Sequence, residues 1–187
     1  MRIIGGEKKG FVLKSPRGEA TRPTLGRVRE SLFGILGPEV VGARVLDLFA
    51  GSGALGLEAL SRGALSCTFV EKSESALASL KANIEKLGYQ ESTNVAKADA
   101  LRWLQMQKTT GWPTFTLAFC DPPYDTELAE RALQLMSNHL PLELNSTVVI
   151  QTSPRETLTD DVGRLRKYRT QKYGDTVLHF YVCVSKI

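Results

Sequence analysis

The sequence contains few residues of the kinds that build disulfide or metal frameworks. Its 187 residues include three cysteines, Cys67, Cys120 and Cys183, and two histidines, His139 and His179. The cysteines are odd in number, lie far apart and form no Cys-x-x-Cys pair. We therefore expect buried reduced thiols, with no disulfide framework and no metal site.

Long hydrophobic runs are also missing. No apolar stretch approaches the roughly 20 residues of a membrane-spanning helix, and residues 1–6 lack the apolar run and cleavage site of a secretory signal. With 42% hydrophobic and 24% charged residues, the composition is typical of one soluble globular domain. We predict a cytoplasmic protein that is monomeric and has no membrane partner.

Charge is low overall but uneven along the chain, whose net charge is +4. Residues 1–46 carry nine basic and four acidic side chains, residues 155–187 carry seven and four, and residues 47–154 carry eight and twelve. Basic ends around an acidic centre suggest that the termini contact a polyanion while the centre has another task.

From about residue 44 onward, hydrophobic runs alternate with stretches of helical periodicity, which is typical of a parallel sheet flanked by helices. We predict strands at 45–49, 67–71, 94–96, 114–120 and 147–151, and helices at 53–62, 73–88, 127–138 and from about residue 100. Two β-rich runs, 165–172 and 176–184, flank a Tyr-Gly-Asp turn and predict an antiparallel hairpin. The predicted fold class is α/β, with a seven-stranded, mostly parallel sheet and a C-terminal antiparallel hairpin.

The N-terminal part does not follow this alternation. Residues 1–20 contain several glycines around a short apolar run and predict a small β extension. Residues 27–36 have helical spacing and end at Gly37-Pro38. No repeat or long linker separates two large domains, so we divide the chain into this extension and one domain over residues 21–187.

The run Gly51-Ser52-Gly53-Ala54-Leu55-Gly56 matches G-x-G-x-x-G between a predicted strand and a predicted helix. Such a turn lets a ligand approach the backbone, where helix N–H groups face it. A nicotinamide-dependent oxidoreductase would show the same turn, with Glu71 bonding ribose hydroxyls. A turn that merely needs small residues would also show it, so this pattern leaves several classes of protein open.

Four carboxylates lie at or near the ends of successive predicted strands: Asp47, Glu71, Asp99 and Asp121. Ligands of open parallel sheets bind beyond the carboxyl ends of the strands, so we expect these side chains to converge on one crevice. A carboxylate there can meet a cationic ammonium group. This arrangement favours a ligand other than a nicotinamide cofactor.

The runs Asp-Leu-Phe-Ala-Gly-Ser-Gly at 47–53 and Asp-Pro-Pro-Tyr at 121–124 together resemble S-adenosylmethionine-dependent methyltransferases that modify exocyclic amino groups of nucleobases. Within that group, segments 22–33, 50–63 and 172–176 are similar to the RsmD family, which methylates N2 of one guanine in bacterial small-subunit ribosomal RNA. The resemblance spans nearly the whole chain. It implies a Rossmann-like methyltransferase fold, S-adenosylmethionine as cofactor with S-adenosylhomocysteine as product, and 16S ribosomal RNA in an assembly particle as partner.

The resemblance also implies roles for individual residues. Asp47 and the glycine loop would hold the methionine part of the cofactor, Glu71 its ribose, and Asp99 with Ala100 its adenine; Asp99 is equally well interpreted as a helix N-cap. The implied cofactor-binding residues are Thr24, Asp47, Phe49, Ala50, Gly51, Ser52, Gly53, Glu71, Lys72, Asp99, Ala100 and Asp121.

The predicted catalytic residues are Asp121, Pro122, Pro123 and Tyr124. An exocyclic amine shares its lone pair with the ring and is a poor nucleophile. The Asp121 carboxylate and the Pro122 carbonyl can accept hydrogen bonds from the amino group, which favours a pyramidal nitrogen, and the prolines hold these acceptors in place. Tyr124 can stack on an extruded base, which contributes roughly 1–3 kcal/mol.

The basic N-terminal part is predicted to contact RNA phosphates, which position RNA without reading its sequence. The predicted RNA-binding residues are Arg2, Lys8, Lys9, Arg22, Arg27 and Arg29. Two alternatives remain at this stage besides the oxidoreductase: an adenine-N6 methyltransferase of DNA or RNA, which shares the tetrapeptide, and a non-catalytic RNA-binding assembly factor, in which the tetrapeptide would have degenerated.

Overall fold

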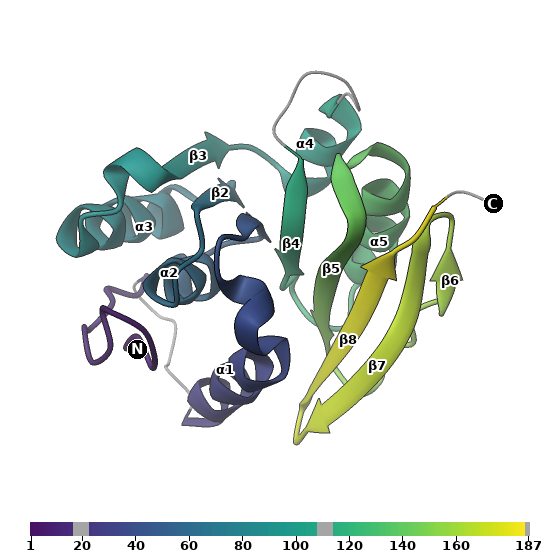
Figure 1. The fold of residues 1–187 in the computed structure, drawn as a ribbon, viewed down its shortest axis with the longest axis horizontal. Coiled ribbons are helices and arrows are strands. Elements are labelled where there is room, and N and C mark those ends of the chain that lie inside the picture. Colours follow the sequence, from purple (N-terminus) through teal and green to yellow (C-terminus); the bar gives the residue numbers. More distant parts are fainter. Residues whose placement is uncertain (17–22, 108–113, 186–187) are drawn as a thin grey trace.

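A single eight-stranded sheet forms the centre of the protein, whose computed structural model describes residues 1–16, 23–107 and 114–185 (Figure 1). The strand order is β3-β2-β1-β4-β5-β8-β7-β6. The parallel strands are β1 (Arg44–Leu48), β2 (Ser66–Glu71), β3 (Thr93–Lys97), β4 (Phe115–Cys120) and β5 (Leu142–Thr152). The antiparallel strands are β6 (Asp161–Val162), β7 (Leu165–Tyr173) and β8 (Thr176–Cys183).

The predicted α/β architecture with a C-terminal antiparallel hairpin is confirmed. Seven predicted strands are present, and the sequence analysis missed the eighth, β6, because two residues show no alternation. Strand β5 also begins five residues before its predicted start, in a polar stretch that includes Asn145 with φ +64° and a register shift against β4.

The described part of the chain also forms five α-helices and two short 3-10 helices. They are α1 (Pro23–Leu36), η1 (Gly37–Val40), α2 (Ala54–Ser61), α3 (Glu74–Leu87), η2 (Gln90–Ser92), α4 (Ala100–Met106) and α5 (Leu128–His139). Helix α3 begins and ends as predicted: the Ser73 hydroxyl accepts a hydrogen bond from Ala76 N at 3.4 Å, and Gly88 closes the helix at φ +75°. Helix α1 begins four residues earlier than predicted, at Pro23, since proline is well suited to a first helical position.

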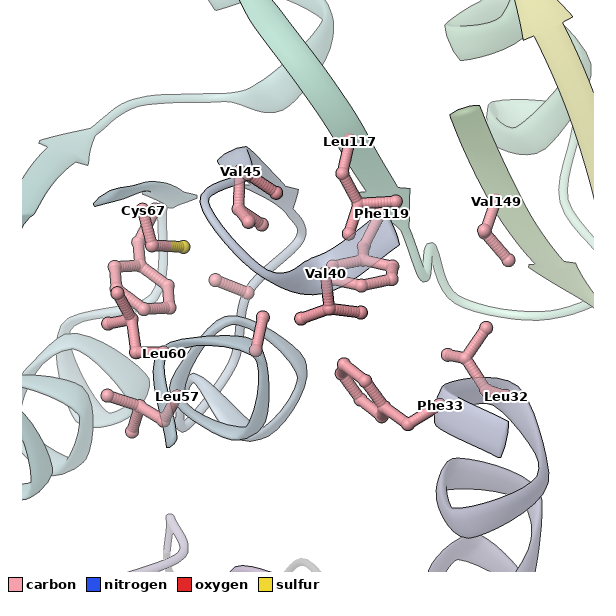
Figure 2. Packing of buried hydrophobic residues seen from close by; sticks show 14 of the residues in the cluster. Leu32, Phe33, Val40, Val45, Leu57, Leu60, Cys67, Leu117, Phe119 and Val149 are labelled. Carbon is pink, nitrogen blue, oxygen red and sulfur yellow. The ribbon is translucent and has the colours of Figure 1, made fainter. Parts of the chain in front are cut away.

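The two faces of the sheet bury two separate apolar cores. One face packs against α1, α2 and α3, and Figure 2 shows side chains of strands and helices meeting in that core. There the rings of Phe33 on α1 and Phe119 on β4 contact edge to face, with centroids 5.7 Å apart. The other face packs against α4 and α5. Strands covered on both faces read as nearly continuous apolar runs, which explains why the strands were recognisable in the sequence.

The N-terminal segment, residues 1–16, lies along α2 and takes part in the first core. A single β-bridge joins Arg2 and Val12, and Ile3 and Leu13 are buried among the helices. The backbone N–H groups of residues 4 and 5 each donate a hydrogen bond of 2.8 Å to the carboxylate of Glu58, which is fully buried on α2. The segment is therefore held to the domain by buried polar groups as well as by apolar contacts.

The three cysteines are buried free thiols, as predicted. Burial raises the pKa of Cys67 and of Cys120 well above its ordinary value. Within residues 1–16, 23–107 and 114–185, no group of three or more His, Cys, Asp or Glu side chains could hold a metal ion. No helix in these ranges is both long and apolar enough to cross a membrane.

Candidate active site

The carboxyl ends of the central parallel strands open into a cleft of about 610 Å³, a volume typical of small-molecule sites. Its described lining comes from the N-terminal segment, the segments that follow β1, β2, β3 and β4, the end of β5 and the beginning of β8. The lining residues are Met1, Pro16, Phe49, Ala50, Gly51, Ser52, Ala54, Val70, Glu71, Lys72, Ser73, Ser75, Ala76, Ala98, Ala100, Asp121, Pro122, Pro123, Tyr124, Gln151, Asp175 and Thr176.

The floor of the cleft is the loop between β1 and α2. Phe49, Gly51 and Gly53 have φ values of +58°, +56° and +83°, respectively. Glycine adopts this conformation without cost, whereas for Phe49 it stores backbone strain of about 1–3 kcal/mol, as is common at functional sites. The loop leads directly into the first turn of α2, which begins at Ala54.

The Glu71 carboxylate ties this loop to β2. One of its oxygens accepts a hydrogen bond of 2.8 Å from Gly51 N, and the other accepts bonds of 2.8 Å and 2.7 Å from the backbone N–H groups of Lys72 and Ser73. Glu71 also lines the cleft. It is therefore held rigidly, with its carboxylate at the position where a ligand would meet it.

A second connection runs from the loop to the N-terminal segment through Asn83 on α3, whose side chain is buried. Its amide group donates hydrogen bonds to Ser52 O at 3.0 Å and to Lys14 O at 2.9 Å, and its oxygen accepts one from Lys14 N at 2.7 Å. Asn83 therefore joins the floor of the cleft to the segment whose Pro16 forms part of the wall.

Asp47 lies beneath the loop and not on the cleft surface. It is 2% exposed and accepts a hydrogen bond of 2.9 Å from Gly56 N in the first turn of α2. Burial raises its pKa to about 8, and the nearby carboxylates of Asp121 and Glu71 contribute to the increase. Its direct contact in this structure is with the protein backbone.

Asp99 caps α4, as one of its two interpretations predicted. Its carboxylate accepts hydrogen bonds of 3.1 Å and 3.2 Å from Leu101 N and Arg102 N, and it lies 3.6 Å from Lys72 Nζ. Partial burial raises the pKa of Asp99, but the two backbone hydrogen bonds and the positive charge of Lys72 lower it by more, so the pKa lies below its ordinary value. The next residue, Ala100, lines the cleft.

The Asp-Pro-Pro-Tyr tetrapeptide follows β4 and lines the same cleft as the glycine loop, which follows the neighbouring strand β1. Pro122 is buried, and Asp121 and Tyr124 line the cleft. The Tyr124 hydroxyl accepts a hydrogen bond of 2.7 Å from Gln151 Nε2 and lies 3.0 Å from Thr176 Oγ1. Partial burial raises the pKa of Tyr124, so its hydroxyl stays protonated at neutral pH.

The charge and polarity of the cleft suit a cationic ligand with a flat apolar part. Among its described lining side chains, three are carboxylates, those of Glu71, Asp121 and Asp175, and one is a lysine, Lys72. Carboxylates that converge on a partly enclosed space attract a cation. Small apolar residues near β2, such as Val70, line the same space and leave room for a planar ring.

The structure brings together most, but not all, of the predicted site residues. Those on the cleft are Phe49, Ala50, Gly51, Ser52, Glu71, Lys72, Ala100, Asp121, Pro122, Pro123 and Tyr124. Asp47, Gly53 and Asp99 lie just outside its lining, and the side chain of Thr24 is outside the described part. The sequence analysis missed two residues that line the cleft, Gln151 and Thr176. Gln151 could have been found as a polar residue directly after the apolar run of β5, and Thr176 as part of segment 172–176, which resembles a known family.

The predicted RNA-binding residues occupy three different environments. Arg2, Lys9 and Arg27 are exposed and Lys8 is half-buried. Arg29 is 5% exposed, donates to Arg2 O and lies 3.5 Å from the buried carboxylate of Glu58. Arg29 therefore stabilises the N-terminal segment from the interior, where RNA does not reach it, and Arg22 lies outside the described residues.

The mostly parallel sheet, the glycine loop after its first strand and the antiparallel C-terminal hairpin define a Rossmann-like methyltransferase fold. Solved structures agree: the chain superposes with a TM-score of 0.87 on a structure described as "Putative methyltransferase yhhF from Escherichia coli", at 33% identity and covering 100% of this chain and 99% of that one. An RNA methyltransferase from Salinibacter ruber shares the fold alone, with 13% identity and a TM-score of 0.65.

The chain belongs to the family described as "Conserved hypothetical protein 95", whose model matches residues 1–182, and the predicted RsmD resemblance is thereby confirmed. It is 39% identical to the Bacillus subtilis protein named "Putative rRNA methyltransferase YlbH", over 97% of this chain and 98% of that protein. It is 33% identical to "Ribosomal RNA small subunit methyltransferase D" of Escherichia coli, over 97% of this chain and 89% of that protein.

Proposed function

We propose that this protein transfers the methyl group of S-adenosylmethionine to the exocyclic N2 of a guanine in small-subunit ribosomal RNA. The observation that carries the proposal is that Asp121 to Tyr124, the glycine loop and Glu71 line one cleft. The names of relatives over nearly the whole chain support ribosomal RNA as the substrate class. They favour this function over the adenine-N6, oxidoreductase and non-catalytic alternatives.

The residues of the cleft fit the proposed cofactor. The open space around Gly51, where an added Cβ would meet no atom within 4 Å, leaves the backbone accessible to the methionine part. Glu71 and Ala100 both line the cleft; in this proposal Glu71 accepts hydrogen bonds from the ribose hydroxyls and Ala100 lies against the adenine. Asp47 supports the loop from below, and a cation above would favour its ionised form.

Catalysis in this proposal depends on positioning. When bound, the cofactor supplies an electrophilic methyl group on a sulfonium sulfur, so the protein needs no nucleophile of its own. Asp121 and the Pro122 carbonyl accept hydrogen bonds from the target amino group and orient its lone pair towards the methyl group. Tyr124 stacks on the extruded base. Alignment of the reacting atoms supplies much of the rate enhancement.

The test uses small-subunit ribosomal RNA from a strain that lacks the corresponding gene, with isotopically labelled S-adenosylmethionine and nucleoside analysis of the product. We expect N2-methylguanosine. Recovery of N6-methyladenosine would contradict the guanine target, and absence of transfer to naked RNA and to assembly particles alike would contradict the function. Calorimetry should show binding of S-adenosylmethionine and none of NAD.

Asp121→Ala tests the catalytic assignment. Removal of one preorganised hydrogen-bonding group at a reacting centre typically costs about 10²- to 10³-fold in rate. We expect a loss of this size in single-turnover methyl transfer, with S-adenosylmethionine bound nearly as tightly as by the wild type. Retained turnover would show that Asp121 does not hold the amine.

We further propose that Arg2 and Arg27 contact RNA phosphates beside the cleft. Arg2 follows Met1, a lining residue. Arg27 lies one helical turn before Ser31, whose hydroxyl bonds to Tyr173 in the hairpin that borders the cleft. Lys9 lies near the C-terminal end of α2, as the hydrogen bond from the neighbouring Lys8 N to Ser61 Oγ shows. The cleft lies at the N-terminal end of α2, about 12 Å away along the helix.

Salt dependence of RNA binding tests these contacts. Each lost phosphate contact lowers the slope of log K against log salt concentration by about 0.7 to 0.9. We expect this decrease for Arg2→Ala and Arg27→Ala, and a smaller one for Lys9→Ala as the matched control. Equal slopes for all three variants and the wild type would refute the proposed surface.

A further inference from the structure

The hydroxyl of Tyr124, which lies in the loop after β4, makes hydrogen bonds with residues of two strands. Gln151 on β5 donates to it through Nε2 at 2.7 Å, and Thr176 on β8 is 3.0 Å away through Oγ1. Gln151 and Thr176 are 6% and 4% exposed, respectively, and both line the cleft beside Tyr124. These two hydrogen bonds therefore join three separate segments at one phenol group.

The directions of the two bonds are complementary. Because the Gln151 amide donates to the phenol oxygen, the phenol proton is available for Thr176 Oγ1. A tyrosine side chain rotates only about χ1 and χ2. Two bonds from buried partners hold the phenol oxygen in place and so fix the direction of the side chain. Because the phenol oxygen conjugates with the ring, its O–H bond prefers the ring plane, and a proton directed at Thr176 Oγ1 therefore favours one plane of the ring.

The backbone next to the ring is held by the same strand end. Asp125 has φ +56°, and its carboxylate accepts a hydrogen bond of 2.6 Å from Ser153 Oγ. Ser153 directly follows the last residue of β5, two residues after Gln151. The Thr126 hydroxyl closes the turn by donating to Pro123 O at 2.8 Å. The ring and the backbone of the tetrapeptide are thus both anchored to neighbouring segments.

We propose that Gln151 and Thr176 are positioning residues that hold the Tyr124 ring in the plane on which the target base stacks. This inference rests on the proposed function. A ring that is free to rotate spends part of its time in orientations that leave the base unaligned with the donor methyl group. Loss of either bond therefore lowers the rate of methyl transfer and leaves cofactor binding unchanged, since neither bond involves the glycine loop or Glu71.

Near-isosteric substitutions test this directly. Thr176→Val and Gln151→Met each remove one bond with little change in volume, and Thr176→Ser keeps the hydroxyl. We expect kcat to fall about 5-fold in Thr176→Val and in Gln151→Met, the loss expected for one ordinary hydrogen bond, with calorimetric Kd for S-adenosylmethionine unchanged. Thr176→Ser should restore the wild-type rate. Far-ultraviolet circular dichroism and melting temperature verify folding.

A double-mutant cycle separates positioning from general loss of structure. Tyr124→Phe removes the hydroxyl that both partners bind, so Thr176→Val should cause no further loss of kcat in that background. Independent losses that multiply in the double variant, or wild-type kcat in Thr176→Val and Gln151→Met, would overturn the positioning role while leaving the proposed function standing. A wild-type protein without methyl-transfer activity would overturn both.

Discussion

Replacing Asp47 by Asn should change how the stability of the protein depends on pH. The carboxyl group of Asp47 is 2% exposed, and burial raises its pKa from 3.8 to about 8. The asparagine carboxamide has nearly the same shape, is neutral at every pH, and can still accept the hydrogen bond from Gly56 N. The substitution therefore removes the titration and keeps the packing.

The sign follows from proton binding. Between about pH 4 and pH 8 the folded wild type retains a proton on Asp47 that the unfolded chain has released, so its unfolding free energy falls as pH rises, by about 1.4 kcal/mol per pH unit. His179 acts in the opposite direction at lower pH, because burial lowers its pKa from 6.5 to about 4: its contribution is complete above pH 6.5 and is lost as pH falls towards 4.

The useful window is therefore pH 6.5 to 8, where neither protein also loses stability through protonation of His179. Over this window the variant should gain roughly 2 kcal/mol relative to the wild type. Other groups titrate equally in both proteins and cancel in the difference. Urea unfolding at four pH values and constant ionic strength, without cofactor, measures it.

The control is Asp160→Asn. Lys167 lowers the pKa of Asp160, so that carboxyl is ionised throughout the window in both folded and unfolded protein, and its substitution should give a difference that does not vary with pH. If the difference between Asp47→Asn and the wild type were equally flat from pH 6.5 to 8, the buried carboxyl would not be protonated and the reasoning would fail.

Three further predictions concern the loop and its supports. Gly56→Ala should cost roughly 1–3 kcal/mol of unfolding free energy in denaturant melts, because the new Cβ would lie 2.4 Å and 2.5 Å from atoms of two β2 side chains. In the control variant Gly34→Ala the new Cβ would meet no atom within 4 Å, so this substitution should stabilise helix α1 by about 1 kcal/mol. Equal effects of the two substitutions on stability would contradict the packing argument. Asn83→Ala removes three hydrogen bonds and should speed limited proteolysis within the N-terminal segment, and an unchanged cleavage rate would argue against this connection. In Glu71→Gln an NH₂ group replaces one of the two carboxylate oxygens that together accept three backbone N–H bonds. Calorimetry should therefore show roughly tenfold weaker binding of S-adenosylmethionine, about 1.4 kcal/mol. Wild-type affinity would argue against a role of Glu71 in cofactor binding.

Features with a local physical cause were predictable from the sequence. Ser73 and Gly88 delimit α3 because a hydroxyl can cap free N–H groups and glycine readily adopts positive φ. The convergence of Glu71 and Asp121 on one cleft was predictable because the carboxyl ends of parallel strands meet at one edge of a sheet. The first argument needs only residues that are neighbours in the sequence. The second needs only the rule that parallel strands have their carboxyl ends at the same edge of the sheet.

Predictions that required the environment of a side chain were less successful. Arg29 belongs to a basic segment, yet its guanidinium lies beside the buried carboxylate of Glu58. Nothing in the local pattern distinguishes it from the exposed Arg27. Asp47 was expected to face the crevice, but the alternation of β1 and the approach of α2 direct it beneath the loop.

The sequence by itself determined the α/β class, the order of most elements and the two motifs that line the cleft, because alternating hydrophobicity, caps and strand-end residues are local signals. Only the tertiary structure decided which side chains are desolvated and which distant ones touch. Tyr124, Gln151 and Thr176 come from three segments and meet because β5 pairs with both β4 and β8. Such contacts depend on how strands are ordered in the sheet, and strand order is a property of the packed chain as a whole.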